Sequence, residues 1–224
     1  FLGRRFIGPC PPVVIVGTDQ SKADWGHMLK PLGLLSDQNA LADPIEVLWT
    51  AADPLFLNEQ GLETLAERLS QYDRPLLILD SYHACVSHLQ IEDSGSAYAN
   101  PLNALLVVCA QTNATACVIH HANKGNGGSL ISSSRGTTAL TAVPSQLLHM
   151  AYLRGDDQPD KRITLKTMGR SGHPASLLIE RTDAGWTLHG DGGEVEAAEQ
   201  LQEAIDSLEG RQADLYDHIC SRWE

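Results

Sequence analysis

The chain has 224 residues, enough for one ordinary domain or for one domain plus an appendage, and its content of 42% hydrophobic and 20% charged residues is typical of globular proteins. Its formal net charge of -12 excludes a broad basic surface that would coat nucleic acid or anionic membrane, so any contact with DNA must be local. No apolar run reaches the roughly 20 residues that a membrane span needs. Five cysteines without a Cys-x-x-Cys pair predict reduced thiols in a cytoplasmic protein.

The first half of the sequence alternates apolar runs of strand length with segments of helical spacing. Strands are expected over 11–19, 45–50, 74–82 and 115–121. The third of these runs is continuous in apolar residues, which predicts burial on both faces. Ser21, with Asp24 in capping-box position, is expected to begin a helix that reaches about Leu35 and is bent or shortened by Pro31. Further helices are expected after Asn58 and over about 96–113.

The second half predicts an antiparallel meander followed by a helical tail. Short turns join the apolar runs 145–153, 162–168, 176–181 and 186–189. The Gly-Asp-Gly-Gly stretch at 190–193 indicates a linker, and helix is expected from Glu194 to Glu224 with a break near Gly210. The fold class is therefore α/β, a mostly parallel sheet flanked by helices with a C-terminal antiparallel β extension. Two parts are expected, a core over 1–190 and a linker with its tail over 191–224.

Three of the expected strands are followed by side chains that can bind a metal ion or transfer a proton. Asp19, Asp80 and the pair His120–His121 each follow an apolar run, and the carboxyl ends of parallel strands meet at one edge of a sheet. Asp80 could hold Mg²⁺ or cap the following turn, and Asp19 could orient a water molecule or cap the next helix. Successive strand residues point to opposite faces, so at most one histidine can face a ligand. A histidine metal site lacks other His or Cys ligands at a suitable spacing.

Three segments carry a family resemblance: LLILDSYHA, IEDSGSAYANPLNALLVVCAQTNATACVIHHANKG and SSSRGTTALTAVPSQLLHMAYL. Their order, their spacing, the paired histidines and the Ser-Arg-Gly that closes the loop are similar to RecA-like hexameric ATPases of the P-loop NTPase superfamily, closest to the RepA-type plasmid replicative helicases. The resemblance covers about residues 1–190 and is strongest over 74–153. It implies a RecA-like fold.

The resemblance implies roles for the residues at the strand ends. Asp80 resembles the Mg²⁺-associated acid that ends the Walker B strand. Asp19 falls where the family has its catalytic glutamate, although its side chain is one methylene shorter. His120 or His121 corresponds to the residue that senses the γ-phosphate and passes the nucleotide state to the adjoining loop.

The resemblance also implies contacts with DNA and with a neighbouring subunit. The loop over 122–135 resembles the segment that faces the central channel, where nucleic acid would meet Lys124, Asn126 and Arg135. In the stretch LKTMGRSGHP, two cations resemble the basic finger that enters a neighbour's ATP site, and a solvated β-turn is the alternative. These two cations are Lys166 and Arg170.

The sequence contains no Gly-x-x-x-x-Gly-Lys-Ser/Thr motif, the loop that cradles phosphates. Because Phe-Leu-Gly at 1–3 resembles the segment that follows the P-loop helix in the family, we expect an N-terminally truncated core that cannot hydrolyse ATP itself. The complete protein would then use ATP and Mg²⁺ as a homohexameric helicase, or as a replication or repair protein, acting on single-stranded DNA. The alternative is a non-enzymatic oligomeric module that binds nucleic acid or protein. The tail resembles the start of a winged helix, with a plain amphipathic helix as the alternative.

Overall fold

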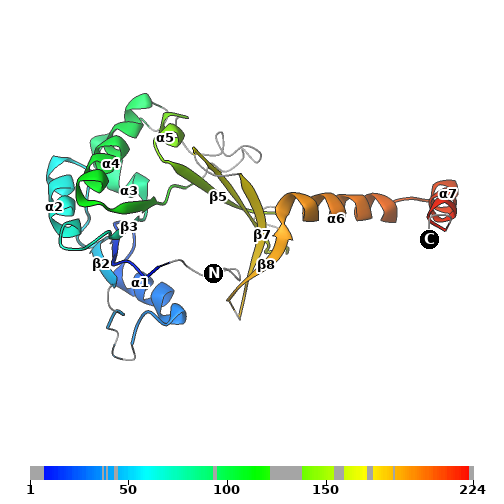
Figure 1. The fold of residues 1–224 in the computed structure, drawn as a ribbon, viewed down its shortest axis with the longest axis horizontal. Coiled ribbons are helices and arrows are strands. Elements are labelled where there is room, and N and C mark those ends of the chain that lie inside the picture. Colours follow the sequence, from blue (N-terminus) through cyan, green and yellow to red (C-terminus); the bar gives the residue numbers. More distant parts are fainter. Residues whose placement is uncertain are drawn as a thin grey trace. The chain divides into compact units, whose positions relative to one another are not determined.

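The computed structural model describes residues 8–36, 38, 40–42, 45–92, 95–121, 138–153, 159–170, 174–183 and 185–221. The chain folds into two compact units, Phe6–Pro144 and a second that contains Ser145–Glu224 (Figure 1). Each unit has a sheet of its own. The expected division between 1–190 and 191–224 stays a prediction.

The first unit contains a parallel sheet with helices between its strands. The strands are β1 (Val13–Gly17), β2 (Ile45–Thr50), β3 (Leu76–Leu79) and β4 (Thr115–Val118). They lie in the order β2-β1-β3-β4, and every pair is parallel. The helices are α1 (Lys22–Leu29), α2 (Glu59–Leu69), α3 (Tyr82–Val86), α4 (Asn100–Thr112) and α5 (Thr138–Ala142). The predicted α/β class with a parallel sheet is thereby confirmed.

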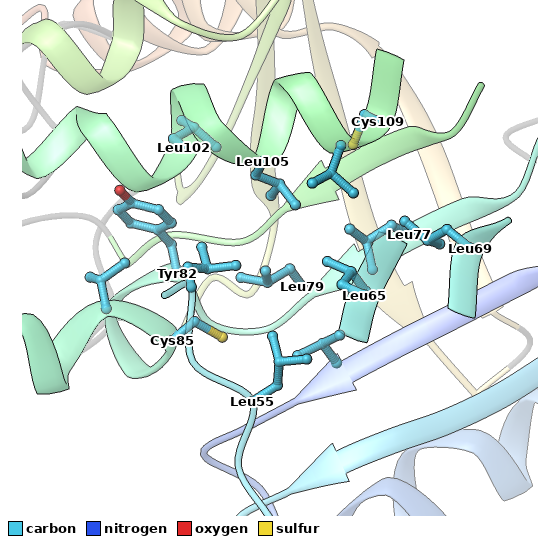
Figure 2. Close-up of a cluster of buried hydrophobic side chains, with 14 of the residues drawn as sticks. Leu55, Leu65, Leu69, Leu77, Leu79, Tyr82, Cys85, Leu102, Leu105 and Cys109 are labelled. Carbon is cyan, nitrogen blue, oxygen red and sulfur yellow. The ribbon is translucent and has the colours of Figure 1, made fainter. Parts of the chain in front are cut away.

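Alternation along β1 divides the apolar residues of this sheet between two faces. Val14 and Val16 belong to the larger cluster, which α2, α3 and α4 complete with residues such as Leu65 and Leu105 (Figure 2). Ile15 belongs to a smaller cluster with Trp25 and other residues of the α1 side. Because parallel sheets are stable when both faces are covered, this division fixes which helices lie on which face.

Helix α1 begins as the sequence predicts and ends early. The Ser21 hydroxyl accepts a hydrogen bond from the backbone of Asp24, and the Asp24 carboxylate accepts one from the backbone of Ser21. The helix stops at Leu29, and a single 3₁₀ turn over Lys30–Leu32 contains Pro31. Proline has no N–H to donate and clashes with the preceding turn, so the helix does not reach Leu35.

Glycine is required at the end of β1, where a helix lies directly on the backbone. A Cβ atom on Gly17 would lie 1.9 Å from the indole nitrogen of Trp25. Trp25 is 8% exposed and is part of the smaller apolar cluster. Only a residue without a side chain therefore allows α1 to pack at this point of the sheet.

The second unit is an antiparallel sheet with two helices after it. Its strands are β5 (Gln146–Tyr152), β6 (Ile163–Gly169), β7 (Ala175–Thr182) and β8 (Gly185–Asp191), paired in that order. Helices α6 (Gly192–Asp206) and α7 (Arg211–Cys220) follow, which confirms the helical tail and its break near Gly210. The linker predicted at 190–193 is wrong. Its first two residues finish β8, and the carboxylate of Asp191 caps α6 by accepting from the backbone of Gly193 and Glu194.

Candidate functional site

The candidate site lies where three parallel strands end at the same edge of the first sheet. The register pairs Val16 of β1 with Leu79 of β3, and Leu79 with Val118 of β4. The chain therefore leaves the three strands at the same level. Asp80 follows β3 directly, and Asp19 comes two residues after the end of β1.

Two hydrogen bonds cross between these strand ends. The side-chain amide of Gln20 donates from Nε2 to Oδ2 of Asp80 over 3.1 Å. The hydroxyl of Ser81 donates to Oδ2 of Asp19 over 3.0 Å. The dipeptides Asp19–Gln20 and Asp80–Ser81 thus exchange hydrogen bonds, each polar residue holding the acid of the other strand. Sequence reasoning missed Gln20 and Ser81, although each is the immediate neighbour of an acid that it singled out.

Backbone hydrogen bonds fix the positions from which this exchange is made. The N–H of Gln20 donates to the carbonyl of Gly17 over 3.1 Å, and its carbonyl accepts from Ala51 over 2.9 Å. The N–H of Asp80 donates to the carbonyl of Val16 over 2.8 Å, which extends the pairing of β3 with β1. Asp80 therefore stands on backbone that belongs to the sheet edge, and Asp19 lies in the turn between β1 and the anchored Gln20.

The two acids differ in their burial and in their electrostatic environment. Asp19 is exposed and Asp80 is half-buried. Burial is the main reason why the pKa of Asp80 lies above its ordinary value, and the negative charge of Asp19 raises it further. The hydrogen bond from Gln20 and the charge of His121 act in the opposite direction and lower that pKa. A cation brought to this edge would favour the ionised form of Asp80.

The paired histidines have different surroundings. His121 is exposed and lies close enough to Asp80 to influence its pKa. His120 is half-buried, and its ring centroid lies 6.0 Å from that of Tyr82 and 6.1 Å from that of Tyr98. Tyr82 and Tyr98 belong to the larger apolar cluster. The structure thus puts His121 near Asp80 and His120 in an aromatic group, a choice that the sequence left undecided.

Carboxylates are the kind of ligand that Mg²⁺ prefers, and Asp80 and Asp19 both lie at this edge of the sheet. Each uses one oxygen, Oδ2, in the exchanged hydrogen bonds. Within the part of the chain that the structure describes, no three His, Cys, Asp or Glu side chains form a metal-binding group. The edge therefore offers a pair of carboxylates, and the remaining ligands of an ion would come from water or substrate.

The two cations compared with a basic finger lie in the second unit. Lys166, on β6, is half-buried between His149 of β5 and Ser176 of β7. Burial lowers the pKa of His149, and the charge of Lys166 lowers it further. Arg170 follows β6, and its N–H donates to the carbonyl of Ser145 over 3.0 Å.

The three residues expected to contact nucleic acid, Lys124, Asn126 and Arg135, lie outside the described residues. A hollow of about 210 Å³ opens between the end of β2 and the start of α2. Trp49, Phe56 and Thr64 are among its lining residues, and none of the predicted site residues is. It therefore adds nothing to the candidate site.

Within the described residues, no helix is both long and apolar enough to cross a membrane. Comparison with known protein families finds no match. A search of curated proteins likewise finds none. Among solved structures, the chain is similar to a KaiC-like protein from the hyperthermophilic archaeon Pyrococcus horikoshii OT3, at 10% sequence identity and a TM-score of 0.48. That match covers 80% of this chain and 76% of the archaeal one.

Proposed function

We propose that the chain is the RecA-like ATPase core of a DNA helicase or of a DNA replication or repair protein. One observation carries this proposal: Gln20 and Ser81 exchange hydrogen bonds with Asp80 and Asp19, so that both acids share one edge of a parallel sheet. Ligands of open α/β sheets bind at this edge, beyond the carboxyl ends of the strands. The motifs over 74–153 point to the same family.

In this proposal each residue has a separate task. Asp80 associates with Mg²⁺, which when bound neutralises charge on the phosphates of ATP. Asp19 is exposed and accepts the proton of the attacking water. His121 stands beside Asp80, so a change of charge at the site alters the force on its ring. It thereby passes the nucleotide state to the loop that follows.

The phosphates need a cradle, and we propose that a strand and helix outside these 224 residues supply it. The sequence lacks a P-loop motif. Among the described strands, β4 has one neighbour, β3, so its other edge is open to a further strand. Beside that edge Cys117 is exposed, and Ile119 is 38% exposed. An apolar side chain there favours a covering element. The chain by itself would then not turn over ATP.

Assembly and DNA binding complete the proposal. We propose a homohexamer in which Lys124, Asn126 and Arg135 contact single-stranded DNA in the channel. Lys166 and Arg170 would reach a neighbour's ATP. Few cations per subunit suffice, because a ring repeats them around one strand, and this agrees with a net charge of -12.

One experiment tests the enzymatic role. In the protein completed with a P-loop strand and helix, Asp80→Ala and Asp19→Ala should each lower kcat for ATP hydrolysis by about 100-fold or more. Asp73, an exposed acid that precedes β3 at the opposite end of the strand, provides the control. Asp73→Ala should leave kcat within about twofold, because surface charges far from a site matter little. Turnover that survives both Asp80→Ala and Asp19→Ala would refute the proposal.

The absence of a P-loop motif favours a second candidate, a non-enzymatic oligomeric module that binds nucleic acid or protein. The same preparation distinguishes the two. The module would bind DNA without nucleotide and show no turnover even with the added segment. The ATPase core should lose DNA affinity and salt dependence in a Lys124→Ala, Arg135→Ala double variant, while its nucleotide affinity without DNA is unchanged.

A further inference from the structure

At this edge of the sheet, the side-chain amide of Gln20, which follows β1, contacts the carboxylate of Asp80, which follows β3. Its backbone is anchored to Gly17 and Ala51, so its side chain reaches Asp80 from a fixed point. The other amide atom, Oε1, is buried and has no hydrogen-bond partner within the described part of the chain. Among the described residues, the amide of Gln20 therefore makes its hydrogen bond to the carboxylate of Asp80 through Nε2.

The orientation of the amide follows from the charge on its partner. An amide offers either N–H donors or a carbonyl oxygen, and an ionised carboxylate only accepts. If the amide were rotated by half a turn, Oε1 would face Oδ2 of Asp80, and the two oxygens would repel each other. Leaving Oε1 buried without a partner costs free energy, and a hydrogen bond to a charged acceptor offsets that cost. Gln20 therefore favours an ionised Asp80 in one rotamer.

We propose that Gln20 is a positioning residue for Asp80, holding Oδ2 of the carboxylate in place and leaving Oδ1 for a ligand. Ser81 does the same for Asp19 from the other direction. The inference rests on the proposed function for its use, since the fixed carboxylate would serve Mg²⁺ bound to a nucleotide. It assigns to Gln20 a role that no sequence motif indicates. It also connects the turn after β1 to the carboxylate at the end of β3.

The test is NMR of the side-chain amide protons of Gln20 in the 224-residue chain. The proton donated to Asp80 should shift downfield and exchange with solvent about tenfold more slowly than that of an exposed amide. Gln202 is the matched control, because its Nε2 donates to Oδ1 of Asp206 over 2.7 Å on the exposed surface of α6. The downfield shift and slow exchange should vanish in Asp80→Leu. Asp80→Asn, which keeps a carbonyl acceptor, should retain part of both.

The backbone amide spectrum of α1, next to this edge, reports whether each variant is folded. Should Asp80→Leu not fold, the comparison of wild type with Asp80→Asn decides instead. The inference is overturned if the Gln20 protons of the wild type exchange as fast as those of Gln202, or if replacement of Asp80 leaves them unchanged. This readout does not depend on turnover. A completed protein that shows the Gln20 signal and no ATP hydrolysis would contradict the proposed ATPase and support the positioning of Asp80.

Discussion

The hydroxyl of Ser81, a residue that is 1% exposed, holds the carboxylate of Asp19 over 3.0 Å. A buried side chain at the end of β3 thereby fixes an exposed acid at the end of β1. The two residues are 62 positions apart in the sequence, so the contact exists only when the parallel sheet is formed. Its loss should be felt both in the position of Asp19 and in the stability of the first unit.

Replacing Ser81 by alanine should lower the free energy of unfolding by about 1–2 kcal/mol. The serine also caps α3, since its hydroxyl accepts a hydrogen bond from the backbone of Ala84. Ser87→Ala is the control, because the Ser87 hydroxyl donates to the Ala84 carbonyl at an exposed site, and it should cost less than about 0.5 kcal/mol. Urea unfolding measures both. Equal costs for the two variants would contradict the role given to Ser81.

Replacing Asp80 by asparagine should stabilise the chain at neutral pH. Burial raises the pKa of Asp80, so its ionised form costs stability once the pH rises through that pKa in the folded chain. Below the ordinary aspartate pKa the carboxyl is protonated in both states, and the advantage of Asp80→Asn should disappear. Urea unfolding at pH 7 and at about pH 3 compares the two conditions.

Asp24→Asn is the control of opposite sign. The hydrogen bonds from Ser21 lower the pKa of Asp24, so its ionised form contributes stability above the ordinary aspartate pKa and loses it as the pH falls. Asp24→Asn should therefore destabilise the chain at neutral pH, and this effect should fade in acid. If both variants shift stability in the same direction at pH 7, the assigned environment of Asp80 is wrong.

The cysteines should differ sharply in reactivity. Burial, partly offset by a hydrogen bond to Thr18, raises the pKa of Cys85 to about 11. Burial also raises the pKa of Cys109, whereas Cys10 and Cys220 are exposed. Because the thiolate is the reactive form, alkylation at pH 8 should modify the two exposed cysteines about 100-fold faster than the two buried ones. Mass spectrometry of peptides gives the order, and early labelling of Cys85 would contradict the packing of the larger cluster.

Arg162 should hold α6 to the antiparallel sheet. Its guanidinium donates to Oδ2 of Asp160 over 2.7 Å and to Oε2 of Glu199, on α6, over 3.1 Å. The hydrogen bond to Asp160 raises the pKa of the arginine most, and the one to Glu199 raises it further, so Arg162 stays charged. A lysine cannot donate to two carboxylates with the planar fork of a guanidinium, so Arg162→Lys should lower the free energy of unfolding by about 1 kcal/mol. Hydrogen exchange of the α6 amides should then accelerate.

Arg68→Lys is the matched control for this experiment. Arg68, on α2, forms the same kind of pair with Glu46 of β2 in the first unit. Arg68→Lys should lower the free energy of unfolding by a similar amount and leave the hydrogen exchange of the α6 amides unchanged. Exchange of α6 that is the same in the wild type and in Arg162→Lys would show that Glu199 does not anchor the helix.

Local features of the fold were predictable because their causes are local. The cap formed by Ser21 and Asp24, the Asn58 cap of α2 and the end of α1 before Pro31 each depend on neighbours within a few residues. Strand-length apolar runs likewise indicated the parallel sheet and the meander. The pattern failed at Asp191, whose flanking glycines resemble a linker. There a side-chain cap, which outweighs the low helix propensity of glycine, starts α6.

The sequence by itself determined which strands end in acids and histidines, since an apolar run followed by a polar residue is visible without a fold. Only the tertiary structure decided how those ends meet. The order β2-β1-β3-β4 sets β1 beside β3, which brings Gln20 to Asp80 and Ser81 to Asp19. Alternation separates the two histidines, and the packing around β4 decided which of them lies where: His121 near Asp80 and His120 near Tyr82. Strand order and register depend on packing between distant segments, and periodicity within one segment carries no information about its neighbours.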